Sequence, residues 1–248
     1  MITQKNKPLA IIGERANDFI INGLSDNGFN VLLLPVDNRL APQVSSHADM
    51  LLLTIDNNVF CNKDYYEKNG DIFKLIREYG YNIVPLDFEV SNAYPYDVAL
   101  NQAIIGNHVI GRKESAAVGA LEYALAHQYT YHNVKQGYAK CSTLILNEKA
   151  IISADAGIIS LASTLNINAL KIENGVSEIT LDGYDYGFIG GASAVYCDKV
   201  FFFGNLNLHS NARQIADHCK ANGLFPISLG KEGLCDIGGA IILPYINN

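Results

Sequence analysis

The chain has 248 residues, of which 49% are hydrophobic and only 17% charged, with a formal net charge of -7 at pH 7. This composition excludes an intrinsically disordered chain and supplies enough apolar surface for a large buried core. The 18 basic residues face 25 acidic ones and form no basic run, which argues against a nucleic-acid partner.

The N-terminal segment predicts neither a signal peptide nor a membrane span. Five apolar-type residues, 9–13, precede Glu14 and Arg15, and this run is too short for either. We therefore expect a cytoplasmic protein with no membrane partner.

The cysteines indicate a reducing compartment. They are odd in number and widely spaced: Cys61, Cys141, Cys197, Cys219 and Cys235. Since there is no C-x-x-C pair and no closely spaced Cys/His cluster, we expect no disulfide scaffold and no metal site.

Five helix-to-strand junctions recur along the chain. They lie at positions 28, 80, 128, 166 and 223, with a mean spacing just under 49 residues, and four of them carry the Gly or Asn that ends a helix. We expect helices over 18–25, 71–79, 115–126, 157–165 and 211–221, each followed by a strand over 29–34, 81–86, 129–134, 167–172 and 224–229. The chain is therefore predicted to be an internal repeat.

A second strand and a return strand complete each unit. Second strands are expected over 49–55, 101–105, 141–146, 188–195 and 236–243, and return strands over 59–62, 108–111, 150–153 and 199–204. The fifth unit ends one strand short, and residues 9–13 can supply the missing strand. Such ring closure leaves no unpaired sheet edge.

These units predict one domain over 1–248, with repeats of approximately 9–62, 63–113, 114–155, 156–205 and 206–248. Strands joined through a crossover helix are parallel, and hairpin partners are antiparallel. The expected fold class is α/β: a five-bladed α/β propeller with pseudo-fivefold repeats and closure between the N- and C-terminal strands.

Three short motifs carry a family resemblance: His-Ala-Asp-Met at 47–50, Gly-Tyr-Ala-Lys-Cys-Ser at 137–142 and Gly-Phe-Ile-Gly-Gly-Ala-Ser at 187–193. With the blade architecture, they resemble the pentein superfamily, the guanidino-group-modifying enzyme fold. They are similar to a clostridial-type branch that implies no assigned reaction. In the hydrolytic penteins a last-blade cysteine attacks the guanidinium carbon, a histidine acts as acid and base, and carboxylates hold the cation.

The resemblance carries over only in part. Cys235, two residues after Gly233 and ahead of the final strand, matches the place of the nucleophile. The fourth blade has Phe188 and the glycines after it where the histidine should stand, and the third blade has Lys140 to Ser142 in place of a carboxylate signature.

The residues that begin the second strands are expected to converge on the propeller axis. We predict Cys235, His47 and Asp49 as catalytic residues, and Asn101, Lys140, Cys141 and Asp236 as substrate-binding residues. A nearby His or Lys favours the reactive thiolate. The alternatives stay open: both cysteines can be small buried residues, and His47 can bind a loop backbone.

Two details of this arrangement follow from strand alternation. Asp49 lies two residues after His47 on the same face, where it could orient the imidazole or meet a substrate cation. Asp236 would point to the face opposite Cys235, which weakens a joint role. The paired glycines at 190–191 and 238–239 have no following Lys-Ser/Thr or helix start, so they indicate close strand packing and no phosphate-bearing cofactor.

Two functions stay open from the sequence. The first is a cysteine-dependent hydrolase or amidino-transfer enzyme acting on a small guanidine- or amidine-like substrate, with no cofactor. The second is a pseudoenzyme that binds a small molecule or a partner and has lost the chemistry.

Overall fold

Three-stranded sheets of one repeated design make up most of the structure. The computed structural model describes residues 7–173 and 178–246. In this part of the chain the five three-stranded sheets, in strand order, are β17 (Ile241–Leu243), β1 (Leu9–Gly13) and β2 (Asn30–Leu34); β3 (Leu52–Ile55), β4 (Asn58–Asn62) and β5 (Asn82–Leu86); β6 (Ala103–Ile105), β7 (His108–Gly111) and β8 (Thr130–Asn133); β9 (Thr143–Asn147), β10 (Ala150–Ser153) and β11 (Asn168–Lys171); and β13 (Ser193–Tyr196), β14 (Lys199–Phe202) and β15 (Phe225–Ser228). Two short strands, β12 (Ile179–Thr180) and β16 (Leu234–Cys235), form a separate pair.

Each three-stranded sheet combines one antiparallel and one parallel pair. For example, β4 pairs antiparallel with β3 and parallel with β5. A short turn joins the antiparallel pair, whereas the parallel pair needs a crossover, which a helix supplies. The predicted repeat of helix, strand and hairpin is confirmed.

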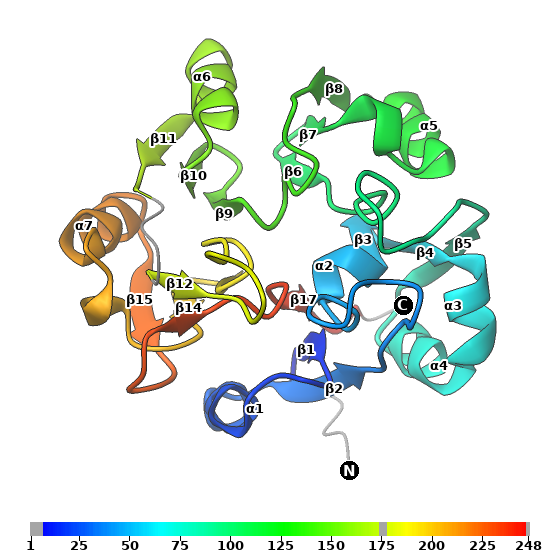
Figure 1. Ribbon diagram of the computed structural model, residues 1–248, viewed down its shortest axis with the longest axis horizontal. Helices are drawn as coiled ribbons and strands as arrows, with labels where there is room; N and C mark the ends of the chain where they lie inside the picture. Colours follow the sequence, from blue (N-terminus) through cyan, green and yellow to red (C-terminus); the bar gives the residue numbers. More distant parts are fainter. Residues whose placement is uncertain (1–6, 174–177, 247–248) are drawn as a thin grey trace.

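Five helices make these crossovers: α1 (Asp18–Asp26), α4 (Gly70–Glu78), α5 (Val118–Ala126), α6 (Ala156–Thr164) and α7 (Ala212–Ala221). Figure 1 shows them at the periphery of the molecule, with β3, β6, β9 and β17 nearer its middle. Four further short helical segments were not predicted: α2 (Ala48–Leu51), α3 (Lys63–Lys68) and the 3-10 turns η1 (Lys113–Ser115) and η2 (Leu206–Leu208). The Asn62 side chain begins α3 by accepting hydrogen bonds from the backbone N–H groups of Asp64 and Tyr65.

The two ends of the chain share one sheet, as predicted. β1 pairs antiparallel with β17, with Leu9 opposite Leu243 and Ile11 opposite Ile241. β1 also alternates between two parts of the core, because Leu9 and Ile11 pack with one apolar cluster while Ala10 and Ile12 pack with another that includes helix α1. The pairing leaves neither edge of β1 open.

The predicted second strands begin too early. Residues 49–51, expected to be strand, belong to the one-turn helix α2 (Ala48–Leu51). Strands β6, β9, β13 and β17 also start two to five residues after their predicted first residues. The intervening segments make local turns, in which Met50 N–H donates to His47 and Thr143 N–H donates to Lys140. Continuous apolar runs do not separate a buried turn from a buried strand, so periodicity could not find these boundaries.

Candidate functional site

A cavity of about 230 Å³ lies where the turns before several first strands meet. His47, Tyr138, Phe188 and Asp236 line it, and each stands five residues before the first strand of its sheet, β3, β9, β13 or β17. The equivalent residue of the remaining sheet is Val98, which is fully buried. Hence the repeat, and not proximity in sequence, assembles this site.

Aromatic rings form one wall of the cavity. Tyr138 and Phe188 stack with their ring centroids 6.1 Å apart, and Tyr186 meets Phe188 edge-on at 5.8 Å. Tyr184 and Tyr186 line the same cavity from the loop between β12 and β13, and their side chains are 47% and 40% exposed. Ring faces attract cations, so this wall suits a small cationic ligand.

Asp236 and His47 form the polar side of the cavity, and both are buried. The Asp236 carboxylate accepts the backbone N–H of Phe188 at 2.8 Å and that of Gly238 at 2.9 Å. One of its oxygens lies 3.9 Å from Nδ1 of His47. Burial lowers the pKa of His47 despite the opposing charge of Asp236, so the imidazole is neutral at neutral pH and able to accept a proton.

A buried thiol–carboxyl pair lies beside the cavity. Cys141, which lines it, donates from Sγ to Oδ2 of Asp49 at 2.8 Å. Burial raises the pKa of Asp49 to about 7, with Asp236 adding to this effect and Lys140 opposing it. Burial, together with the charge of Asp49, holds the pKa of the Cys141 thiol well above its usual value. The expectation that Asp49 orients His47 is not met, because α2 replaces the strand and the carboxyl turns to Cys141.

Asn101 holds this pair in place. Its Nδ2 lies 3.1 Å from Cys141 Sγ and 3.4 Å from Met50 Sδ, and its Oδ1 accepts the backbone N–H groups of Lys140 at 2.9 Å and Cys141 at 3.1 Å. Met50, Asn101 and Cys141 each stand two residues before the first strand of their sheets. The amide is fully buried, so it acts on the ligand only through these neighbours.

The contacts continue from sheet to sheet through glycines. Gly191 N–H donates to the carbonyl of Cys141 at 3.1 Å, and Gly239 N–H donates to the carbonyl of Gly191 at 2.8 Å. A Cβ atom on Gly190 would lie 2.3 Å from the Thr143 carbonyl oxygen, and one on Gly191 would lie 1.9 Å from Asp236 Oδ1. The glycine pairs therefore serve close packing, as predicted, although they lie in turns and not inside strands.

Lys140 brings positive charge to the same cluster. Its Nζ donates to the carbonyl of Gly190 at 3.3 Å, and its charge acts on Asp49. Lys140 is half-buried and does not line the cavity. The structure thus places it behind the site, where its charge acts on Asp49.

Cys235 lies apart from the other thiol. It lines a larger hollow of about 940 Å³, which shares His47 and Asp236 with the smaller cavity. Its Sγ lies 3.3 Å from the Phe203 carbonyl oxygen and 3.8 Å from Nδ2 of Asn17. Burial raises the pKa of this thiol to about 11. Asp236 also lines this hollow, so the two neighbouring residues share it, although the strand alternation predicted opposite faces for them.

The structure therefore divides the predicted site residues into groups. Asp49, Asn101, Lys140 and Cys141 form one cluster; His47 and Asp236 stand between the two cavities; Cys235 faces only the larger one. Sequence reasoning gave no place in the site to the aromatic residues Tyr184 and Tyr186. The observed strand starts place Tyr138 at the position in its repeat that is equivalent to His47. The predicted strand starts were wrong, so the sequence did not reveal this equivalence.

Two features are absent from residues 7–173 and 178–246, the part of the chain that the structure describes. Over these ranges, no group of three or more His, Cys, Asp or Glu side chains could hold a metal ion. Nor does any helix there combine the length and the apolar character needed to cross a membrane.

Comparisons with known proteins agree on the fold. A family model described as "Family of unknown function (DUF6873)" matches residues 11–241. A search of curated proteins finds no matching relative. Among solved structures, an amidinotransferase of the saxitoxin biosynthetic pathway from Microseira wollei matches with a TM-score of 0.61 and 12% identity, over 98% of this chain and 95% of that one.

Two other solved structures match with a TM-score of 0.56 and 12% identity. Dimethylarginine dimethylaminohydrolase from Pseudomonas aeruginosa, complexed with citrulline as a cysteine-to-serine variant, covers 90% of this chain and 91% of its own. Inosamine-phosphate amidinotransferase from Streptomyces griseus covers 92% of this chain and 78% of its own. The chain has the α/β fold of these pentein structures, as the motifs led us to expect.

Proposed function

We propose that this chain, which belongs to the DUF6873 family of unknown function, is a cysteine-dependent enzyme acting on a small guanidine- or amidine-like cation. The observation that carries the proposal is a pair of adjoining cavities that share His47 and Asp236. Cys235 lines the larger one, and aromatic rings line the smaller one together with the Cys141 thiol. Asp49 lies directly behind that thiol. Carboxylates and ring faces together favour a compact cation, and a thiol is the nucleophile suited to its electrophilic carbon.

The proposal includes a closed ring of five blades with pseudo-fivefold symmetry. It is supported by the pairing of β1 with β17 and by the contacts that pass from Asn101 to Cys141, Gly191 and Gly239. Asp49 N–H donates to the Gly238 carbonyl at 3.3 Å, which links the last turn back to the first. Placement in the clostridial-type branch rests on the three short motifs alone.

In the proposed reaction Cys235 is the nucleophile and His47 the acid–base group. The neutral imidazole takes the thiol proton, and sulfur adds to the amidine carbon while the C=N electron pair moves to nitrogen. The amine then leaves with the proton from His47. Water, in a hydrolase, or a second amine, in amidino transfer, displaces the sulfur. Asp236, which lines both cavities, supplies negative charge that holds the cation.

A non-catalytic binding protein is the second candidate, and one observation favours it. Burial raises the pKa of both thiols near the site, that of Cys235 to about 11, so neither is a thiolate at neutral pH in the empty protein. A protein that binds the same cation without attacking it would need no thiolate.

Alkylation with 2-chloroacetamidine, followed by mass-spectrometric mapping, separates the two candidates. Neutral 2-chloroacetamide is the matched reagent, and the exposed Cys197 is the internal reference. The enzyme predicts that the amidine modifies Cys235 faster than Cys197, that guanidinium protects it, and that Cys235→Ser removes this adduct. Protection without preferential labelling would favour the binding protein, and the absence of both would reject the cation site.

A further inference from the structure

The thiol nearest the axial cavity is not the one that the family resemblance selects. Cys141 lines the cavity with His47 and Asp236, whereas Cys235 lines only the neighbouring hollow. Cys141 and Asp49 are 3% and 2% exposed, and Sγ and Oδ2 are 2.8 Å apart. A thiol that already donates to a carboxylate needs no rearrangement to transfer its proton.

The Asp49 carboxyl has one oxygen that makes no hydrogen bond to the described residues. This oxygen, Oδ1, is buried. Buried polar atoms without a partner are uncommon and frequently mark functional groups. Burial also raises the pKa of this carboxyl to about 7, the range in which a general base works best at neutral pH.

Asn101 supplies the third part of the arrangement. Its Nδ2 points a donor at Cys141 Sγ from 3.1 Å, while its Oδ1 is fixed by two backbone N–H groups. A donor aimed at sulfur stabilises the thiolate relative to the thiol. The nucleophile, its base and an orienting group thus lie in one hydrogen-bonded set at the cavity wall.

We infer that Cys141 is a second nucleophile of this protein, with Asp49 as its general base and Asn101 as its positioning residue. This inference rests on the proposed function, because it assumes the same guanidine- or amidine-like substrate. In its step the proton passes from Cys141 Sγ to Asp49 Oδ2, and the new S–C bond forms at the amidine carbon while the C=N pair moves to nitrogen. Collapse of this adduct breaks the C–N bond, and the departing amine takes the proton from Asp49.

The test follows the adduct at Cys141 by mass spectrometry in the full chain treated with 2-chloroacetamidine. In that reaction S–C forms, chloride leaves and Asp49 takes the proton. Cys235→Ser should keep this adduct, and Cys141→Ser should remove it. Asp49→Asn should slow its formation by roughly a hundredfold, while the exposed Cys197 reacts unchanged in all variants.

The dependence of the labelling rate on pH can be measured on the unmodified chain, so this second test does not require any variant to fold. The labelling rate at Cys141 should rise with pH through about 7, where Asp49 ionises. The charged or titratable groups around this pair are Asp236, Lys140, His47 and Tyr138. The lowered pKa of His47 places its titration at more acid pH, and the raised pKa of Tyr138 places its titration at more alkaline pH.

The outcomes distinguish the two proposals. Labelling of Cys235 without labelling of Cys141 would overturn this inference and leave the proposed function intact. A labelling rate at Cys141 that does not rise with pH through about 7 would also overturn it, since Asp49 would then play no part. Absence of preferential amidine labelling at either thiol would reject the proposed enzyme itself.

Discussion

The Asp236 carboxylate accepts the backbone N–H of Phe188 at 2.8 Å, and this bond joins the turn before β17 to the turn before β13. The same carboxylate accepts the Gly238 N–H at 2.9 Å through its other oxygen. One acidic side chain therefore fixes both the aromatic wall and the glycine turn of the cavity, and it also lines the ligand space.

Replacing Asp236 by Asn should destabilise the protein by about 2–4 kcal/mol, because the new NH₂ group would face a backbone donor and the bonds to an ionised acceptor would be lost. Urea denaturation would measure the change. The control is Asp182→Asn in the exposed part of the larger hollow, which should stay within about 0.5 kcal/mol of the parent. Equal effects of the two substitutions would contradict the bridging role of Asp236.

The sequence predicted the sheets better than the site. Helix ends can be recognised from a Gly or Asn, and the strands that follow can be recognised from their runs of β-branched and other apolar residues. The pairing of residues 9–13 with the last strand followed from the fifth repeat being one strand short. The first strands of the sheets were misplaced because apolar residues such as Met50 and Leu51 continue without a break from turn into strand. The misplaced strand start put His47 and Asp49 on one strand face. In the structure Asp49 lies on the one-turn helix α2, and His47 is the residue just before that helix.

The relation between the two thiols could not be predicted from the sequence either. The predicted strand starts put Cys141 and Cys235 at similar places in their repeats, whereas Cys141 stands two residues before β9 and Cys235 six residues before β17. Cys141 therefore lines the cavity of about 230 Å³ and Cys235 the hollow of about 940 Å³. The partner of Asp49 is 92 residues away in sequence, so no local pattern announces that contact.

The close approach at Gly191 gives a second prediction. A Cβ atom there would lie 1.9 Å from Asp236 Oδ1, so Gly191→Ala must displace the bridging carboxylate. We expect a loss of about 3 kcal/mol or more in the free energy of unfolding, together with loss of amidine labelling. Gly70→Ala is the matched control, because nothing lies within 4 Å of the added atom and the residue begins helix α4. A fully stable Gly191→Ala protein would show that the turn can move freely.

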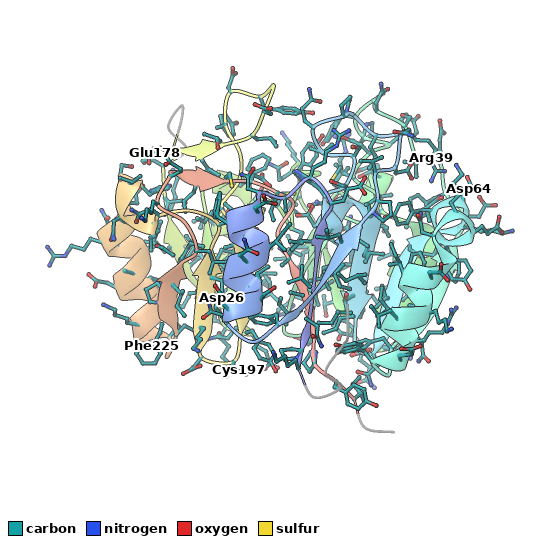
Figure 2. The ribbon with its side chains drawn as sticks, turned by 90° about the horizontal axis from the view of Figure 1, so that it is seen from below. Asp26, Arg39, Asp64, Glu178, Cys197 and Phe225 are labelled. Carbon is teal, nitrogen blue, oxygen red and sulfur yellow. The ribbon has the colours of Figure 1, made fainter. Side chains whose placement is uncertain are left out.

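The aromatic wall gives a third prediction, on ligand affinity. Phe188→Leu keeps most of the volume but removes the ring face, so protection of the cavity thiol by guanidinium should require roughly threefold to thirtyfold more ligand. Phe225→Leu is the control, because Phe225 is 60% exposed and does not line the cavity. In Figure 2, Phe225 and Cys197 lie at the bottom of the view, whereas Glu178 lies at the top. An unchanged protection constant in the Phe188 variant would mean that the carboxylates alone hold the cation.

Stability against pH gives the last prediction, and its sign follows from Asp49. The folded-state pKa of this carboxyl is raised from 3.8 to about 7, so the folded protein keeps a proton that the unfolded chain has already lost. Stability from this group is therefore complete below about pH 4 and falls as the pH rises towards 7, where folded Asp49 also ionises. The full shift corresponds to roughly 4 kcal/mol.

Asp49→Asn removes this titration while retaining an amide of similar shape beside Cys141. Its stability relative to the parent should therefore rise between pH 5 and pH 8 by about 2–3 kcal/mol in urea denaturation. Asp26→Asn, at an exposed carboxyl, should show no such change. If the Asp49 variant instead loses stability relative to the parent as the pH rises, the buried carboxylate is stabilised by its neighbours, and it would be too weak a base to accept the Cys141 proton.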